Sequence, residues 1–137
     1  MSDISPHKLI ILAIDDTVQN LTLIDELLSE LYVVKVAPGG ARGLKIAQGT
    51  PKPDLILLDI MMPDLDGFEV CRLLKANPET QLIPVIFLTA STDTEDERKG
   101  FELGAVDYIH KPISASILLA RVKTHLMLKQ VAVFLKD

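Results

Sequence analysis

The sequence predicts an α/β protein built on a doubly wound, five-stranded parallel sheet. Short runs rich in Leu, Ile and Val, bounded by polar or turn residues, recur along the chain. Runs of this length and composition are typical of strands that are buried on both faces, as in parallel sheets. Segments with helical spacing of apolar residues separate the runs. Strands that alternate with helices favour right-handed βα units with helices on both sides of the sheet, so the predicted order is (βα)5.

Five segments are predicted to be strands. Four of them are apolar enough for burial on both faces, whereas the second carries Lys35 in its interior, which is typical of an edge strand. In chain order the segments are residues 9–14, 32–36, 55–58, 85–88 and 106–109.

Helices are predicted between and after these segments. The clearest pattern is an apolar stripe with steps of three, four and three residues, which lies on one helix face. Its members are Leu21, Ile24, Leu28 and Leu31. Further helices are predicted over residues 40–48 and 67–76, over the mostly exposed segment 93–103, and from Ser114 towards the C-terminus.

The composition and net charge of the chain disfavour several classes of function. The 137 residues have the length of one ordinary domain, and the net charge of -5 disfavours non-specific contact with nucleic acid or an anionic membrane. Every apolar run is far shorter than the roughly 20 residues that cross a bilayer, and residues 1–8 lack the features of a signal peptide. A single cysteine, Cys71, excludes an internal disulfide. We therefore expect a cytoplasmic protein with no membrane segment and no direct contact with nucleic acid.

Polar residues follow the predicted strands at their carboxyl ends, where ligands bind in open parallel α/β sheets. Asp15 and Asp16 follow the first strand and Asp59 follows the third. Thr89 ends the fourth, and Lys111 comes shortly after the fifth. Three carboxylates, a hydroxyl and an ammonium group are therefore predicted to meet at one rim of the sheet.

The carboxylates indicate a metal site. Crowded carboxylates repel one another and raise one another's pKa values unless a cation lies between them. Oxygen ligands without His or Cys favour Mg2+ or Mn2+ over zinc, and the three histidines are too scattered for a metal cluster. Taken singly, the residues have ordinary explanations: Asp16 or Thr17 as a helix cap, and Lys111 as a solvated surface residue.

The motifs at these positions resemble the receiver domains of bacterial two-component response regulators, from about residue 8 to residue 128. The spacings of 30 residues from Asp59 to Thr89 and of 22 residues from Thr89 to Lys111 agree with that family. The resemblance implies the flavodoxin-like receiver fold. The motifs are Asp15-Asp16, Leu57-Leu58-Asp59-Ile60-Met61-Met62-Pro63 with Asp66-Gly67, Leu88-Thr89-Ala90, and Gly104-Ala105-Val106-Asp107-Tyr108-Ile109 leading to Lys111-Pro112.

By this resemblance, Asp59 is the phosphoacceptor and the site holds Mg2+ or Mn2+. The implied metal ligands are Asp16, Asp15 mostly through water, Asp59, and the backbone carbonyl of Met61. Lys111 is implied to pair with an oxygen of the phosphoryl group.

The resemblance also implies a switch. Thr89 would hydrogen-bond the phosphoryl group while Tyr108 turns inward, although the pattern around Tyr108 by itself favours a half-exposed strand aromatic. Pro112 corresponds to a cis proline that aims the preceding lysine inward. Residues 38–43 contain more glycine than the family usually shows, which leaves the start of the second helix open.

We therefore expect a phosphorylation-dependent signalling switch rather than a turnover enzyme. Its donor would be a sensor histidine kinase or a phosphotransfer protein, and its output face would comprise the fourth helix, fifth strand and fifth helix. One alternative is an aspartyl phosphohydrolase, but that class usually needs an acid where Met61 stands. A flavin carrier is disfavoured by the absence of Trp and the 4% aromatic content. A receiver-fold interaction module that is never phosphorylated is disfavoured because every catalytic position is filled.

The domain organisation is predicted as a receiver domain over residues 1–128 and an extension of the last helix over residues 129–137. Two apolar stripes on this helix are out of phase, so the first is expected to pack on the sheet and the second to point away. The extension would contribute to a homodimer or lead to a C-terminal output domain, the alternative being a frayed tail. Residues 97–128 resemble receivers attached to cyclic-dinucleotide enzymes or sensor-kinase modules. The two stripes are Leu119, Val122 and Leu126, and Leu128, Val131 and Leu135.

Overall fold

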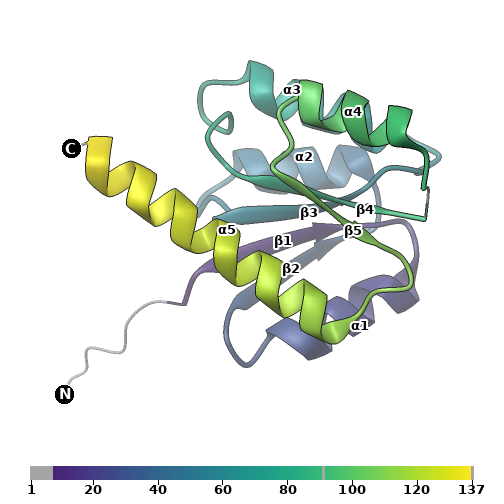
Figure 1. Cartoon of the computed structure of the whole chain (residues 1–137), viewed down its shortest axis with the longest axis horizontal. Coiled ribbons are helices and arrows are strands. Elements are labelled where there is room, and N and C mark those ends of the chain that lie inside the picture. The colour runs from purple at the N-terminus through teal and green to yellow at the C-terminus, as the bar shows by residue number, and fades with distance from the viewer. Residues whose placement is uncertain (1–7, 91, 137) are drawn as a thin grey trace.

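The computed structural model describes residues 8–90 and 92–136, in which strands and helices alternate from β1 to α5 (Figure 1). The predicted (βα)5 order is confirmed. In chain order the elements are β1 (Ile10–Ile14), α1 (Val18–Leu28), β2 (Val33–Ala37), α2 (Gly40–Gln48), β3 (Leu55–Asp59), α3 (Gly67–Ala76), β4 (Val85–Thr89), α4 (Thr94–Glu102), β5 (Asp107–His110) and α5 (Ala115–Lys136).

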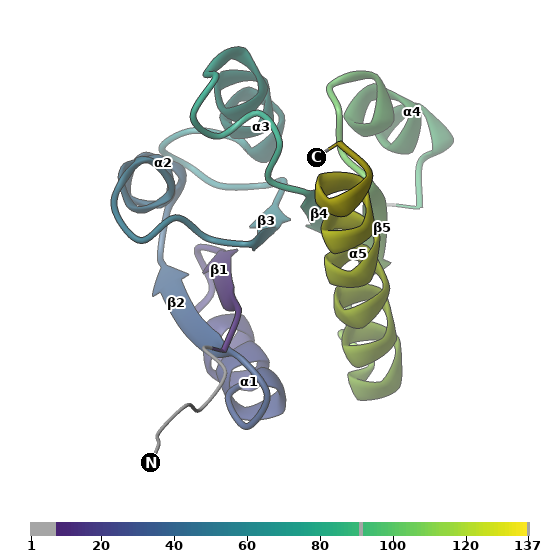
Figure 2. The same ribbon diagram turned by 90° about the vertical axis from the view of Figure 1, so that its left-hand side faces the viewer.

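All strand pairs in the sheet are parallel, and the strand order is β2-β1-β3-β4-β5. Helices α1 and α5 cover one face, and α2, α3 and α4 cover the other (Figures 1 and 2). This is the predicted doubly wound arrangement. Because all strands run in the same direction, their carboxyl ends lie along one rim of the sheet.

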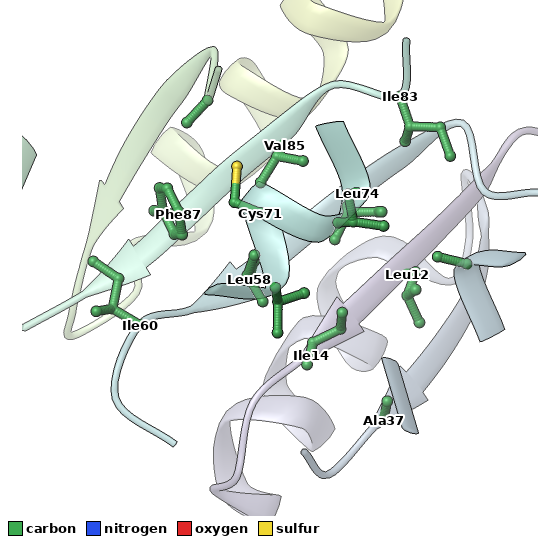
Figure 3. Packing of buried hydrophobic residues seen from close by; sticks show 14 of the residues in the cluster. Leu12, Ile14, Ala37, Leu58, Ile60, Cys71, Leu74, Ile83, Val85 and Phe87 are labelled. Carbon is green, nitrogen blue, oxygen red and sulfur yellow. The ribbon is translucent and has the colours of Figure 1, made fainter. Parts of the chain in front are cut away.

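Each face of the sheet contributes to a separate apolar cluster, because successive side chains of a strand point to opposite sides. Ile11 and Ala13 pack with α1 and α5, whereas Leu12 and Ile14 pack with α2 and α3. Figure 3 shows the second cluster, in which Phe87 lies near Cys71 of α3. The buried setting of Cys71 agrees with a role in packing.

One sequence prediction about the outer elements needs correction. Leu31 lies beyond the end of α1 and is 59% exposed, because the chain turns after Leu28 towards β2. The fifth strand is the second edge of the sheet, yet Tyr108 and Ile109 are buried on its two opposite faces, as predicted. The predicted edge position of the second strand is also confirmed.

The last helix carries its two stripes as predicted. Val122 and Leu126 are buried against the sheet with Leu119 packed beside them, and Leu118 joins them. The residues of the second stripe are 52% to 76% exposed, and the end of α5 extends past the sheet (Figure 1). The second stripe consists of Leu128, Val131 and Leu135. Within residues 8–90 and 92–136, no helix combines the length and the apolar character that crossing a membrane requires.

Candidate functional site

The carboxyl rim of the sheet brings together side chains that are far apart in the sequence. Asp15 directly follows β1, Asp59 is the last residue of β3 and Thr89 is the last residue of β4. Lys111 follows β5, and its backbone N–H donates to the carbonyl oxygen of Thr89 at 2.8 Å. The structure therefore places the predicted residues of four strands at one location.

Three carboxylates of this rim form a compact cluster. Asp15, Asp16 and Asp59 each offer one oxygen, and these oxygens all lie within 4.8 Å of one another. Asp15 is fully buried and Asp59 is 3% exposed, whereas Asp16 faces solvent. The donor set contains oxygen alone, so these residues fit a hard divalent cation such as Mg2+.

The ammonium group of Lys111 lies between two of these carboxylates. Its Nζ is 3.0 Å from Oδ1 of Asp59 and 3.1 Å from Oδ2 of Asp15. The peptide bond to Pro112 is cis, as the family resemblance implies. The lysine is thus an inward-directed member of the rim, which excludes the alternative of a solvated surface residue.

Burial and neighbouring charge alter the protonation of the cluster. The pKa of Asp59 is raised to about 6, mainly by burial; the hydrogen bond from Lys111 acts in the opposite direction, and the nearby carboxylate of Asp15 contributes to the rise. The pKa of Lys111 is also raised, because its bonds to Asp59 and Asp15 outweigh the effect of burial. The surroundings of Asp59 therefore favour binding of a proton or a cation to its carboxylate.

Asp15 is held in place by the start of α1. Its Oδ1 accepts the backbone N–H of Thr17 at 2.9 Å, and its Oδ2 accepts from the side-chain amide of Asn20 at 3.2 Å. Thr17 is the N-cap residue of α1 but its side chain makes no capping bond. The explanation of Asp16 or Thr17 as a side-chain cap is therefore wrong. Asn20 was not predicted, and its polar side chain one turn after the Asp pair was the available signal.

The loop that follows Asp59 is tightly constrained where α3 begins. A Cβ at Gly67 would lie 2.2 Å from the carbonyl oxygen of Asp59, so the backbone needs glycine here. The Gly67 N–H also donates to the carbonyl oxygen of Ile60 at 2.8 Å. Within this loop the side chain of Met61 is 79% exposed. The metal-ligand role of the Met61 carbonyl stays a prediction.

The two predicted switch residues are both buried. Thr89 is 4% exposed and Tyr108 is 3% exposed, so Tyr108 is not the half-exposed strand aromatic that the local pattern favoured. The Tyr108 hydroxyl donates to the carbonyl oxygen of Asp96 at 2.7 Å and lies 2.9 Å from that of Glu97. Burial raises the pKa of Tyr108 to about 12. The ring therefore occupies an inward position beneath α4.

Gly100 of α4 makes room for this ring. A Cβ at Gly100 would lie 1.9 Å from the hydroxyl oxygen of Tyr108. The rings of Phe87 and Phe101 flank Tyr108 with centroids 5.5 Å and 5.1 Å away. Sequence reasoning missed these neighbours, and the glycine inside a predicted helix was the available signal.

Known proteins are similar to this chain in sequence and in fold. Residues 11–123 match the family described as the response regulator receiver domain. A "Probable cyclic di-GMP phosphodiesterase" of Vibrio cholerae is 46% identical over 95% of this chain and 29% of its own length. The response regulator PleD of Caulobacter vibrioides is 44% identical over 83% of this chain and 25% of its own length.

A solved structure agrees with these sequence matches. The receiver domain protein from Methanospirillum hungatei superposes with a TM-score of 0.83 at 28% identity, covering 91% of this chain and 98% of that chain. The chain thus corresponds to nearly all of a solved receiver domain, but it spans less than a third of the length of the two curated relatives described above.

Proposed function

Because this chain belongs to the response regulator receiver domain family, we propose that it works as a phosphorylation switch in which Asp59 accepts the phosphoryl group. The observation that carries this proposal is the burial of Asp59 at the end of β3, within reach of the Asp15 carboxylate and the Lys111 ammonium. A lone aspartate in a turn would lack these partners.

The proposed chemistry is nucleophilic attack by a carboxylate. An oxygen of Asp59 attacks the phosphorus of a phosphohistidine on a sensor histidine kinase or a phosphotransfer protein. A P–O bond forms, the P–N bond breaks, and its electron pair returns to the imidazole nitrogen of the donor. The product is an acyl phosphate on Asp59, so the chain is a phosphoacceptor that acts on itself and not a turnover enzyme.

Receiver domains generally bind Mg2+ at an acidic pocket, and we propose Asp15, Asp16, Asp59 and the Met61 carbonyl as the ligands here, with Mn2+ as a substitute. The oxygen-only cluster supports this assignment. When bound, such a cation neutralises the oxygens of the phosphoryl group being transferred. The Asp15 carboxylate remains oriented by the Thr17 N–H and the Asn20 amide.

Lys111 and Thr89 would stabilise the phosphorylated form. The Lys111 ammonium, 3.0 Å from Asp59 in the unphosphorylated protein, would pair with a phosphoryl oxygen once the carboxylate has become part of the acyl phosphate. Thr89 ends the neighbouring strand and would donate its hydroxyl to another phosphoryl oxygen. Movement of Thr89 would change the packing of Tyr108 under α4 and so alter the face formed by α4, β5 and α5.

The partners of this switch follow from the same proposal. The input partner is a phosphohistidine donor that reaches the rim, and the output partner binds the α4-β5-α5 face. The exposed stripe at the end of α5 supports a contact with a second subunit or with an output domain that follows in the full protein. We also propose a cytoplasmic location, where a buried free cysteine such as Cys71 remains reduced.

The central experiment is labelling by a small phosphodonor. With Mg2+ present, the wild-type protein is expected to gain one phosphate by intact mass, and Asp59→Asn is expected to gain none. Excess chelator should prevent the labelling, since the clustered carboxylates and the incoming phosphate repel each other. Equal labelling of Asp59→Asn would show that another residue is the acceptor.

A further inference from the structure

Helix α2 begins without a capping side chain of its own. Its N-cap residue is Gly39, which has extended backbone and no side chain that could accept a hydrogen bond. The first turn also contains no acidic residue to interact with the positive end of the helix dipole. The free N–H groups of this turn therefore need an acceptor from another part of the chain.

Asp64 provides that acceptor from the loop between β3 and α3. Its Oδ1 accepts the N–H of Gly40 at 3.2 Å, and its Oδ2 accepts the N–H of Ala41 at 3.0 Å. The bond from Ala41 is the main cause that holds the pKa of Asp64 below its ordinary value. One carboxylate thus caps a helix that begins more than 20 residues earlier in the chain.

The glycines at the start of α2 keep this loop close to the helix. A Cβ at Gly39 would lie 3.1 Å from Oδ2 of Asp64, and a Cβ at Gly40 would lie 2.7 Å from the carbonyl oxygen of Leu65. A side chain at Gly40 would therefore force the loop away. This close approach of the loop explains why residues 38–43 contain more glycine than the family usually shows.

The same loop carries groups assigned to the phosphoryl-transfer site. It starts directly after Asp59 and contains Met61, three residues before Asp64. Gly67 fixes the far end of the loop against the Asp59 carbonyl. Between these points Met62 packs in the core, but the side chains of Met61 and Pro63 on either side of it are exposed and give the loop no packing contact there. The bonds of Asp64 to α2 supply a restraint in this exposed stretch.

We propose that Asp64 is a positioning residue for the phosphoryl-transfer site, because it ties the loop bearing the Met61 carbonyl to the first turn of α2. The inference rests on the proposed function of Asp59. Asp64 itself contacts neither the phosphoryl group nor the cation in this proposal. Its loss leaves every expected ligand in the chain but lets the loop sample more conformations, which weakens cation binding.

The test compares Asp64→Ala with a matched control. Asn77→Ala removes a side-chain acceptor from the opposite end of α3, where Asn77 Oδ1 accepts the N–H of Glu79 at 2.9 Å. Titration calorimetry without a phosphodonor measures the Mg2+ affinity of both variants. We expect Asp64→Ala to raise the Mg2+ dissociation constant by roughly threefold to tenfold and Asn77→Ala to leave it unchanged. Amide exchange of Met61 and Met62 in metal-free protein should become faster in Asp64→Ala only.

A second variant separates loop positioning from simple helix capping. Adding Gly39→Ser to Asp64→Ala gives α2 a local cap, and removal of the Asp64 side chain leaves space for the serine. The double variant should regain thermal stability but keep the weakened Mg2+ affinity. Wild-type Mg2+ affinity in Asp64→Ala, or its recovery in the double variant, would overturn the proposal. If the wild type binds Mg2+ but Asp59 is not labelled, the proposed function fails while these measurements still decide the role of Asp64.

Discussion

The ion pairs at the carboxyl rim and those on the outer surface of α4 have similar lengths but different surroundings. At the rim, Lys111 Nζ lies 3.0 Å from an oxygen of Asp59, whose side chain is 5% exposed. On α4, the Arg98 guanidinium lies 2.8 Å from both Glu95 and Glu102, and all three side chains are at least 60% exposed. Solvent screens the α4 pairs, so they contribute little to stability. At the rim, burial raises the pKa of Asp59 in spite of the hydrogen bond from Lys111, and two buried carboxylates share a single ammonium group.

This difference indicates that the buried charges at the rim serve binding of a ligand and not stability of the fold. Asp15 and Asp59 are buried carboxylates that share one ammonium group, an arrangement that costs free energy in the absence of a further cation. A bound cation and a phosphoryl group would relieve that cost. Three substitutions test the comparison, and they are ordered here from the largest expected effect to the smallest.

Lys111→Met should have the largest effect, because it leaves two buried carboxylates without their shared counter-charge. In chelator at alkaline pH, we expect the free energy of unfolding to fall by about 2–3 kcal/mol. Chemical denaturation measures this quantity. The loss should shrink as the solution is acidified, because protonated Asp59 no longer needs the ammonium group. A loss that is independent of pH would indicate a packing role for the lysine stem instead.

Asp59→Asn should change the free energy of unfolding by an intermediate amount and in the opposite direction, towards greater stability. The pKa of Asp59 is raised from 3.8 to about 6, so the folded state binds the proton more tightly than the unfolded state does, and the ionised form destabilises the fold. In chelator near pH 8 the variant should therefore be more stable than the wild type, by about 1–3 kcal/mol.

The pH dependence of this difference supplies the control. The stability advantage of Asp59→Asn should decrease as the pH falls through about 6, be small at about pH 4 and vanish only below about pH 3, where Asp59 is protonated in both the folded and the unfolded state. Saturating Mg2+ should also reduce the advantage, since the ion binds the wild-type carboxylate. An advantage that stays constant from pH 8 to pH 4 would contradict the assigned cause.

Arg98→Ala should have the smallest effect. Its partners Glu95 and Glu102 remain largely exposed to solvent, so neither is left buried and unpaired. The thermal midpoint should change little at low salt and be indistinguishable from that of the wild type at high salt. A loss comparable to that of Lys111→Met would mean that exposure does not explain the contrast between the two regions.

Local patterns predicted much of the fold. The helices predicted over residues 40–48 and 67–76 have those bounds in the structure, because apolar spacing and turn residues act within a few residues of one another. Because the carboxyl ends of parallel strands lie along one rim of a sheet, the residues that follow the strands were predicted to meet there. These residues are Asp15, Asp59, Thr89 and Lys111. The error lies at the periphery, where Leu31 falls outside α1.

The sequence by itself determined the doubly wound architecture and the set of residues at the rim, because hydrophobic periodicity and strand ends are properties of short segments. Tertiary structure decided the contacts that hold these residues. Asp64 caps α2, the Tyr108 hydroxyl lies beneath α4 at Gly100, and Lys111 lies between two carboxylates. Each contact joins residues more than five positions apart in the chain. Such pairings depend on how whole elements pack, and no local pattern of the sequence encodes that packing.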